Sequence, residues 1–370
     1  MRAALNIFLF FVLFSLVFAC ENQKSDNTHY VYIASGSPKD SVGIAVFGWK
    51  AGELTPVGLI DVPASTSYLA VDTLNKRLYS VGDKISAFSV DKAGDLSLIN
   101  QIEPNGEGAC HVSISNDYRF LLVAYYRSGS ASMYGLEENG GIGELVWSVQ
   151  HHGSSVNKER QESAHAHMIL PAPNSNLIIV PDLGIDKVMV YSSDSAGYVS
   201  EAPIPFANIR PGGGPRHAAF HSNGRFVYVL HELTGHVTGF SFDPKQGIVD
   251  SINTVPTLPE DFKDFNKSAD IHITPNGQYL YASNRGHNSL AVMSVDQSTG
   301  ALKYLGTQDC GGDWPRAFAV DPSGEYLLIA NKRSNRISVM KINYKTGFFE
   351  KVSEVDTPLE PQGIRFMSMP

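Results

Sequence analysis

The stretch Phe318-Ala-Val-Asp-Pro-Ser-Gly-Glu-Tyr-Leu-Leu-Ile-Ala-Asn331 decides the fold. It begins as a short apolar strand, turns at Pro-Ser-Gly, and continues as a second strand that opens on an aromatic residue. A further pair of strands follows each such hairpin, so one repeat predicts a four-stranded sheet. Related phrases recur at a spacing of roughly 40 to 57 residues, which is typical of propeller blades. They lie at residues 69–81, 112–123, 169–180, 219–228 and 271–281.

A seventh repeat is divided between the two ends of the chain. Residues 30–61 supply three strands but lack the first strand of the phrase, and Pro361-Gln-Gly-Ile-Arg-Phe366 is a single spare strand. Pairing these segments closes a ring and removes the exposed edges that an open sheet would leave. A β-sandwich would explain neither the missing strand nor the spare one. The sequence therefore predicts an all-β, seven-bladed β-propeller in which the C-terminal strand pairs with the N-terminal blade.

The composition is that of a folded, turn-rich chain. Of the 370 residues, 43% are hydrophobic and 33 are glycine, which is ample material for a core. The formal charge is -8 and the lysines and arginines form no basic block, which argues against nucleic-acid binding. Cys110 and Cys310 fall in distant repeats, so we expect both thiols to be free. No cofactor motif or metal-binding cysteine spacing is present, so we expect neither a cofactor nor a metal.

The first residues have the pattern of an export signal. A basic start precedes an apolar run from Ile7 to Phe18, which is too short to span a bilayer. Ala19-Cys20 at its end is similar to the lipobox of bacterial lipoproteins, although an ordinary cleaved signal with an incidental cysteine is the alternative. We expect a lipoprotein signal peptide at 1–19, a tether at 20–29 and the propeller at 30–370. The protein would reach the periplasm or cell envelope, with lipid on Cys20 as its only membrane contact.

The repeat alignment also predicts which side chains meet at the channel. In a propeller the first strand of each blade lines the channel, so the loop before it and the loop after the second strand lie on one face. The equivalent positions form a ring of Tyr68, Cys110, His167, Arg216, Ala269 and Arg316. The loops that follow the second strands add Asp182, Glu232, Arg285 and Lys332 to the same face. Arginines gathered in this way suit a phosphate or carboxylate, because a guanidinium bonds such groups bidentately.

Three features near this ring allow more than one interpretation. His111, His217 and His272 have the opposite strand parity, so we expect them to face away and to be structural. His165 and His167 share a face with Asp182 nearby, which would permit a metal site, but the usual ligand set is not evident. Gly212-Gly213-Gly214 is either a phosphate-binding loop or, as we favour, a tight turn into the next strand.

Five short motifs stand out at the predicted channel mouth. They are Ser163-Ala-His-Ala-His167, Asp182-Leu-Gly184, Gly214-Pro-Arg-His217, His231-Glu-Leu233 and Ala282-Ser-Asn-Arg-Gly286. Together they resemble the propeller lactonase family, which includes bacterial cycloisomerase-2-type 6-phosphogluconolactonases and fungal carboxymuconate-lactonising enzymes. The resemblance covers nearly all of the chain after the leader. It implies that His167, Arg216, Glu232 and Arg285 are catalytic, and beside them we expect His165, Asp182, Arg316 and Lys332 to bind substrate.

The resemblance implies a lactonase for a small anionic sugar lactone, either 6-phosphogluconolactone or, given export, a related lactone. Opening a lactone requires an activated water, a donor for the developing oxyanion and an anchor for an acidic substituent. Glu232 or His167 could act as general base, while Arg216 and Arg285 would bind the anion and stabilise charge. No Gly-x-Ser-x-Gly elbow or Ser-His-Asp order is present, so a covalent acyl-enzyme is disfavoured.

Two other functions stay open at this point, as does the oligomeric state. The same residues could run the lactonising direction of a muconate-type isomerase. A non-catalytic propeller could instead bind a glycan or a protein partner at the cell envelope. Four converging ionisable groups argue against this second alternative, because a pure scaffold has no need of them.

Overall fold

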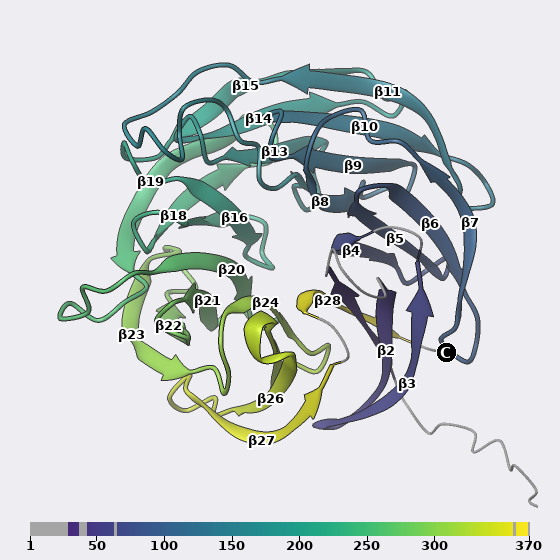
Figure 1. The fold of residues 1–370 in the computed structure, drawn as a ribbon. Helices are drawn as coiled ribbons and strands as arrows, with labels where there is room; N and C mark the ends of the chain where they lie inside the picture. The colour runs from purple at the N-terminus through teal and green to yellow at the C-terminus, as the bar shows by residue number, and fades with distance from the viewer. Residues whose placement is uncertain (1–28, 37–42, 63–64, 358–359, 369–370) are drawn as a thin grey trace, which may run out of the picture.

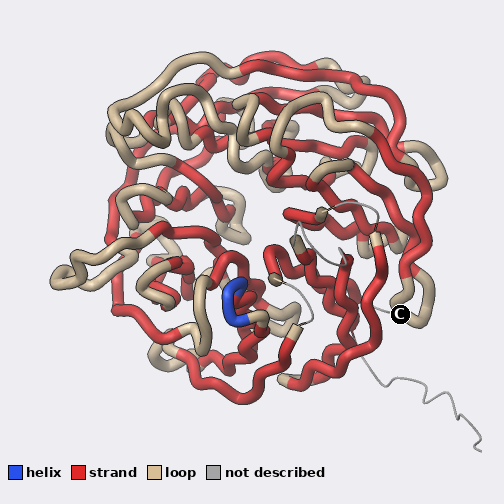
Figure 2. The backbone as a smooth tube through the Cα atoms, viewed as in Figure 1, coloured by secondary structure: helices blue, strands red, loops and turns tan. Residues whose placement is uncertain are grey.

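The structure is a computed structural model that describes residues 29–36, 43–62, 65–357 and 360–368. These residues form 28 strands, which Figure 1 shows arranged in a ring. The strands make seven four-stranded sheets, and neighbours within a sheet run antiparallel. The only helical element in the described ranges is the short 3-10 helix η1 (Lys332–Ser334), drawn blue in Figure 2. The predicted all-β, seven-bladed propeller is confirmed.

Each sheet is one blade, whose strands succeed one another from the innermost outward. The first blade is β28 (Pro361–Ser368), β1 (His29–Ser35), β2 (Gly43–Lys50) and β3 (Glu53–Asp61). The second is β4 (Thr66–Asp72), β5 (Arg77–Gly82), β6 (Ile85–Val90) and β7 (Leu96–Ile102). The third is β8 (Ala109–Ile114), β9 (Phe120–Tyr125), β10 (Ser130–Leu136) and β11 (Ile142–Gln150).

The remaining blades follow the same order. The fourth is β12 (Leu170–Pro171), β13 (Leu177–Asp182), β14 (Lys187–Ser193) and β15 (Val199–Asn208). The fifth is β16 (Pro215–Phe220), β17 (Phe226–His231), β18 (His236–Asp243) and β19 (Gly247–Pro256). The sixth is β20 (Lys267–Ile273), β21 (Tyr279–Arg285), β22 (Ser289–Val295) and β23 (Leu302–Asp309). The seventh is β24 (Pro315–Val320), β25 (Tyr326–Asn331), β26 (Arg336–Ile342) and β27 (Phe349–Asp356).

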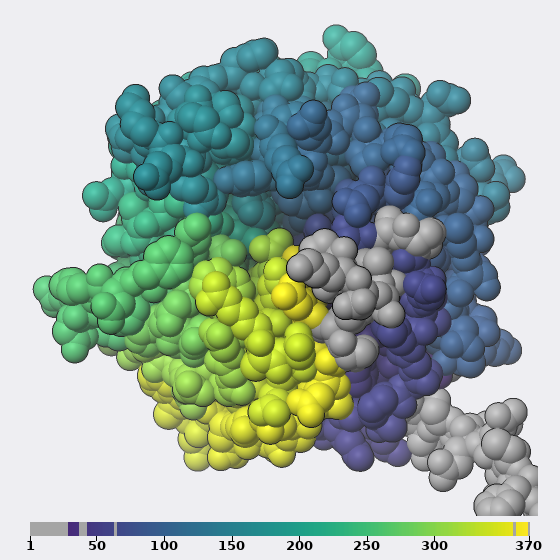
Figure 3. Space-filling view, in the orientation of Figure 1, coloured from purple at the N-terminus to yellow at the C-terminus, as the bar shows by residue number. Residues whose placement is uncertain are grey.

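The two ends of the chain close the ring, as the sequence predicts. β28 pairs antiparallel with β1, with Ile33 opposite Ile364 and Tyr30 opposite Met367. Ile364 and Met367 are fully buried, so the closing strand is part of the core. Figure 1 shows β28 in yellow beside the purple N-terminal strands, and in Figure 3 the yellow and purple ends lie against each other.

Burial explains the apolar runs in the sequence. The second strands β9, β13, β17 and β25 are buried along their whole length, because both of their faces pack against neighbouring blades. The outermost strands β3 and β11 are largely exposed. The core therefore lies between blades, and Trp49 of the first blade packs edge-on against Tyr326 of the last, with 5.5 Å between ring centroids.

The innermost strands are irregular at the level of the predicted ring. In six blades the pairing register slips there, and in four of them the extra residue is Ser67, Cys110, Arg216 or Arg316. A bulge of this kind leaves the extra residue unpaired and re-aims its side chain. One predicted ring position is therefore wrong, because Ser67, and not Tyr68, is equivalent to Cys110 and Arg216.

The error at Tyr68 comes from the anchor of the second blade. Asp72 pairs with Arg77 across a turn as long as the one that joins Asp321 to Tyr326. The second strand of this blade thus begins at Arg77, whereas the sequence pattern favours the apolar residue after it. Shifting the alignment by one residue groups Tyr68 with His111, and the centroids of these two rings are 4.3 Å apart.

Other expectations concern cysteines and the membrane. Cys110 and Cys310 are both free, as expected. Within the described residues, no helix has the length and apolar character needed to cross a membrane. Cys20, the predicted signal peptide at 1–19 and nearly all of the tether at 20–29 lie outside the residues that the structure describes.

Candidate active site

A cavity of about 810 Å³ opens at one mouth of the channel. Its walls are the loops that lead into the innermost strands and the loops that follow the second strands, as the repeat predicts. Basic lining residues outnumber acidic ones, so the cavity favours an anion. The basic residues are Arg127, Arg160, Lys267, Arg285 and Arg316, and the acidic ones are Asp83, Glu107 and Glu232.

Glu232 is the centre of these charges. It follows β17, and only 3% of its surface is exposed. Its Oε1 lies 2.7 Å from Nη2 of Arg160, and its Oε2 lies 2.9 Å from both Nε of Arg216 and Nη2 of Arg285. Burial alone would raise the carboxyl pKa, but Arg285, Arg216 and Arg160 outweigh it and hold the pKa at about 2. Glu232 is therefore an anion at neutral pH.

The guanidinium groups differ in how many partners they have. Arg285 also donates to the carbonyls of Lys267 and Ser268, at 3.1 and 3.0 Å. Arg316, by contrast, makes no hydrogen bond or ion pair with any residue that the structure describes. Burial and repulsion from Arg216 lower the pKa of Arg316 to about 10, so it still carries its charge at neutral pH. Its planar fork is available to an anionic ligand.

His167 lies in the wall of the same cavity. Its Nδ1 is 4.0 Å from Sγ of Cys110, and its ring meets the ring of Tyr126 edge-on, with 5.3 Å between centroids. Burial and the charge of Arg216 lower the imidazole pKa well below its ordinary 6.5, so His167 is neutral and able to accept a proton. Burial raises the pKa of the Cys110 thiol to about 12, which excludes it as a nucleophile at neutral pH.

The sequence of this seven-bladed propeller matches a known family. A family model described as "Lactonase, 7-bladed beta-propeller" matches residues 30–364. The chain belongs to this family. The 6-phosphogluconolactonase of Bacillus subtilis is 34% identical to this propeller lactonase over 261 residues, which cover 69% of this chain and 74% of the relative.

Two further comparisons agree with this family. The 6-phosphogluconolactonase of Formosa agariphila is 34% identical over 303 residues, which cover 76% of this propeller lactonase and 83% of the relative. Among solved structures, a periplasmic gluconolactonase of Pseudomonas aeruginosa superposes with a TM-score of 0.86 at 26% identity. That match covers 92% of this chain and 99% of the other.

The four residues that we expect to be catalytic lie together in this propeller lactonase. His167, Glu232 and Arg285 line the cavity. Arg216 is 2% exposed and reaches the cavity through its ion pair with Glu232. The repeat alignment thus brought residues from three blades to one place, although it says nothing about which of them acts on substrate.

The four expected substrate-binding residues are divided. Arg316 lines the cavity, whereas Lys332 lies outside its lining and pairs with Glu360, with 3.0 Å between Nζ and Oε2. His165 and Asp182 do not line the cavity either. Of the four, the structure therefore brings only Arg316 to the site among the residues described.

His165 and Asp182 instead support the cavity wall from behind. Asp182 is fully buried, and it accepts hydrogen bonds from Nδ1 of His151 and from the backbone N–H of His165, both at 2.7 Å. The ring of His165 stacks on Tyr126, with 4.5 Å between centroids. In the described part of the chain, no group of three or more His, Cys, Asp and Glu side chains is placed to hold a metal ion.

The repeat alignment places Tyr126 at the level of Glu232, and Tyr126 does line the cavity. Sequence reasoning missed other lining residues, among them Arg160, Lys267 and Trp314. Arg160 lies in the segment between β11 and β12, outside the repeat, so an alignment of repeats does not reach it. Lys267 and Trp314 each precede a ring position by two residues, so the repeat alignment contained a signal for these two.

Asp186 holds both the loop that carries Arg160 and the turn at Gly212-Gly213-Gly214. Its carboxylate accepts from Nε2 of Gln161, at 2.8 Å, and so holds the loop that carries Arg160. It also accepts from the backbone N–H groups of Gly212 and Gly214, both at 2.7 Å. The glycine motif is thus a turn that binds an internal carboxylate, in agreement with the interpretation that the sequence favours.

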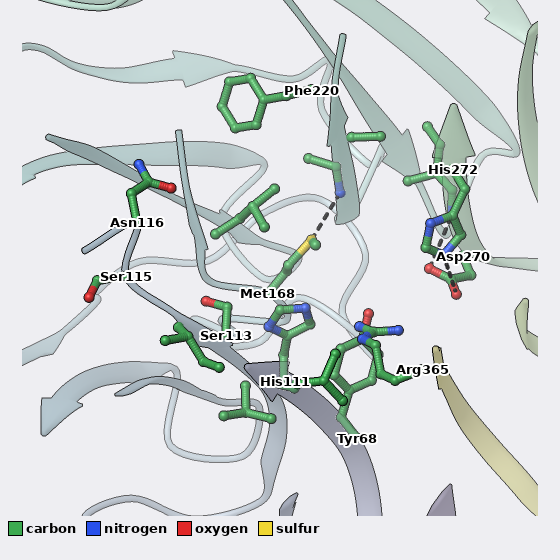
Figure 4. Close-up of a pocket in the computed structure, with 18 of the residues that line it drawn as sticks. Tyr68, His111, Ser113, Ser115, Asn116, Met168, Phe220, Asp270, His272 and Arg365 are labelled. Carbon is green, nitrogen blue, oxygen red and sulfur yellow. Dashed lines mark hydrogen bonds and ion pairs between the residues drawn. The ribbon is translucent and has the colours of Figure 1, made fainter. Parts of the chain in front are cut away.

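A second cavity, of about 500 Å³, opens at the opposite ends of the innermost strands. His111 and His272 line it, so they face away from the candidate active site as their parity predicts. His217 is 3% exposed and lies between the two cavities, with ring contacts to both His111 and His167. Figure 4 shows the polar side chains around this second cavity, including Tyr68, His111, Asp270, His272 and Arg365.

Proposed function

We propose that this propeller lactonase hydrolyses a small anionic sugar lactone in the cavity around Glu232. The observation that carries the proposal is the guanidinium of Arg316, which has no hydrogen-bond or ion-pair partner among the described residues. It lines the same cavity as the neutral His167 and as Glu232 with its paired arginines. The excess of basic lining residues favours an anion. The relatives named 6-phosphogluconolactonase and gluconolactonase support the same class of reaction.

His167 is the proposed general base. A water at its imidazole would lose a proton to the ring as it attacks the lactone carbonyl carbon. Burial and the charge of Arg216 disfavour the resulting imidazolium in the unliganded site, and in this proposal a bound anion offsets the charge of Arg216 and raises the imidazole pKa. Glu232 is a poor base in the unliganded site, because a pKa of about 2 leaves the carboxylate with little proton affinity.

Arg285 and Arg316 have separate roles in this proposal. Arg285 is a fixed donor, since Glu232 and two carbonyls hold it, and it suits the oxyanion that develops on the carbonyl oxygen. Arg316 suits the phosphate or carboxylate of the substrate. The imidazolium of His167 then returns its proton to the ring oxygen as the carbon–oxygen bond breaks, which yields a hydroxy acid.

A panel of lactones tests the proposal with the protein expressed from its full chain. The panel contains 6-phosphogluconolactone, a lactone that carries a carboxylate, and the uncharged gluconolactone, and acid release is followed with a pH indicator. We expect faster cleavage of the charged lactones and loss of that preference in Arg316→Gln. Turnover of none of them would refute the proposal and favour the non-catalytic envelope propeller, while lactone formation from a muconate would favour the isomerase.

We also propose that the protein is exported and anchored at the periplasm or cell envelope. The support is the leader at 1–19 with Cys20 at its end, a tether at 20–29 before the propeller, and the likeness to a gluconolactonase described as periplasmic. Export argues for a lactone other than a phosphorylated metabolite of the cell interior. Cys20→Ala should move the protein from the membrane fraction, and unchanged fractionation would show that the cysteine is incidental.

A further inference from the structure

A buried row of polar side chains runs from the candidate active site toward the second cavity. Nη1 of Arg216 lies 3.1 Å from Nε2 of His217, and Nδ1 of His217 lies 2.8 Å from Oδ1 of Asp270. Arg216, His217 and Asp270 are 2%, 3% and 2% exposed, so water does not compete for these bonds. On the side of the second cavity, His272 approaches the same carboxylate, as Figure 4 shows.

The chemistry of the donors fixes the tautomer of His217. A guanidinium can only donate, so Nε2 of His217 must accept from Arg216. The hydrogen of the neutral imidazole is then on Nδ1 and is donated to Asp270. Burial and the charge of Arg216 lower the pKa of His217 to about 4, so the ring stays neutral at physiological pH.

Both carboxylate oxygens of Asp270 face donors. Oδ1 accepts from Nδ1 of His217 and from the N–H of Ile271, at 2.8 and 3.0 Å. Oδ2 accepts from the N–H of Phe318 and from Nε2 of His272, both at 3.2 Å. In Asp270→Asn the amide NH₂ would face one of these backbone donors in either orientation. The substitution therefore removes the negative charge that faces His217 and leaves one backbone donor against the NH₂ group, without changing the size of the side chain.

We infer that Asp270 and His217 are positioning residues for Arg216 and, through Arg216, for Glu232. Asp270 holds His217 in the tautomer that accepts from Arg216. His217 and the carbonyl of Ala269 then hold Nη1 of the guanidinium, while Nε lies 2.9 Å from Oε2 of Glu232 in an ion pair. His217 and Asp270 do not line the cavity of the candidate active site, and His217 reaches it through its bond to Arg216 and its ring contact with His167. That the loss of these residues lowers turnover rests on the proposed function.

A double-mutant cycle in the full chain tests the pair. We expect Asp270→Asn to lower kcat/KM for a cleaved lactone by roughly 10-fold to 100-fold, as is usual when a partner behind a functional side chain is lost. In an Arg216→Gln background the same change should cost less than about 2-fold, because the residue through which Asp270 acts is already gone. The matched control His272→Asn removes the other side-chain bond to Asp270 and should keep kcat/KM within about 2-fold.

A second cycle replaces Arg216→Gln with His217→Gln, so that the result does not depend on the folding of one variant. Losses that multiply in both cycles would overturn the inference, as would a loss in His272→Asn equal to that in Asp270→Asn. If the parent protein cleaves no lactone, the proposed function fails and the cycles are read from the urea midpoint of unfolding. Non-additive midpoint shifts would then support the pair, and additive shifts would overturn it.

Discussion

Glu232→Gln tests whether this carboxylate is the counter-ion of three arginines or the base of the reaction. The ion pairs lower its pKa from the ordinary 4.5 to about 2, although the group is buried. Because one pKa unit corresponds to about 1.4 kcal/mol, the ionised carboxylate contributes about 3 kcal/mol to folding at neutral pH. Glutamine keeps the shape but leaves the guanidiniums without a counter-charge, so the free energy of unfolding should fall by at least about 3 kcal/mol.

The pH dependence of stability has a defined sign. The folded pKa of Glu232 lies below the unfolded value, so its stabilisation is complete above pH 4.5 and is lost as the pH falls toward 2. Urea denaturation across this range should show a smaller pH dependence in Glu232→Gln than in the parent protein. As a control, Glu103→Gln removes an exposed partner of Lys84 and should change the free energy of unfolding by less than about 0.5 kcal/mol.

The refuting result is an unchanged free energy of unfolding together with a fall in kcat of about 100-fold or more. That combination would make Glu232 the general base, because loss of a base removes chemistry without removing stability. A counter-ion instead requires that the stability of the variant falls together with any loss of activity. Measuring both quantities on the same protein preparation separates the two roles.

Three further changes probe the site and the ring. His167→Asn should lower kcat by about 100-fold or more. Because burial and the charge of Arg216 lower the imidazole pKa of the free enzyme, which kcat/KM reports, the kcat/KM of the parent protein should not fall as the pH is lowered through 6.5. An inflection at pH 6.5 would contradict this. Arg316→Lys should raise KM for a charged lactone by about 10-fold at similar kcat, and an equal effect on gluconolactone would argue against an anion anchor. Met367→Ala should cost about 2–5 kcal/mol in urea denaturation, and a cost below about 0.5 kcal/mol would exclude β28 from the cooperative core.

The fold is predictable because its signals are local and repeated. A Pro-Ser-Gly turn between apolar runs specifies a hairpin, and β25 keeps its whole apolar run buried between blades. The ring closure is also predictable, since the missing first strand and the spare strand are visible at the two ends of the chain. The prediction slipped by one residue at Tyr68, where the second strand of the blade begins with the charged Arg77 and the apolar pattern starts one residue late.

The site is most predictable where its residues lie on the regular repeat. The segment that carries His165 and His167 is irregular, because β12 has just two residues and the part before it is joined to β13 only by an isolated bridge at Ala166, and of these two histidines only His167 lines the cavity. Asp182 ends the regular strand β13, but its carboxylate is taken up by His151 and the backbone N–H of His165. Arg160 is 72 residues from Glu232 along the chain and reaches it from a loop, so its role depends on tertiary packing alone.

The repeated bulge explains how charges from distant blades converge. In a regular strand, successive side chains point to the two faces of the sheet, which in a propeller are the contacts with neighbouring blades. The bulges at Cys110, Arg216 and Arg316 remove these residues from that alternation. Pairing resumes at the next residue, as at His217 opposite Leu230, so the side chains of Arg216 and His217 face different parts of the molecule. Arg216 can therefore bind Glu232 at the cavity while His217 binds Asp270 behind it, and one irregularity supplies both the anion site and its support.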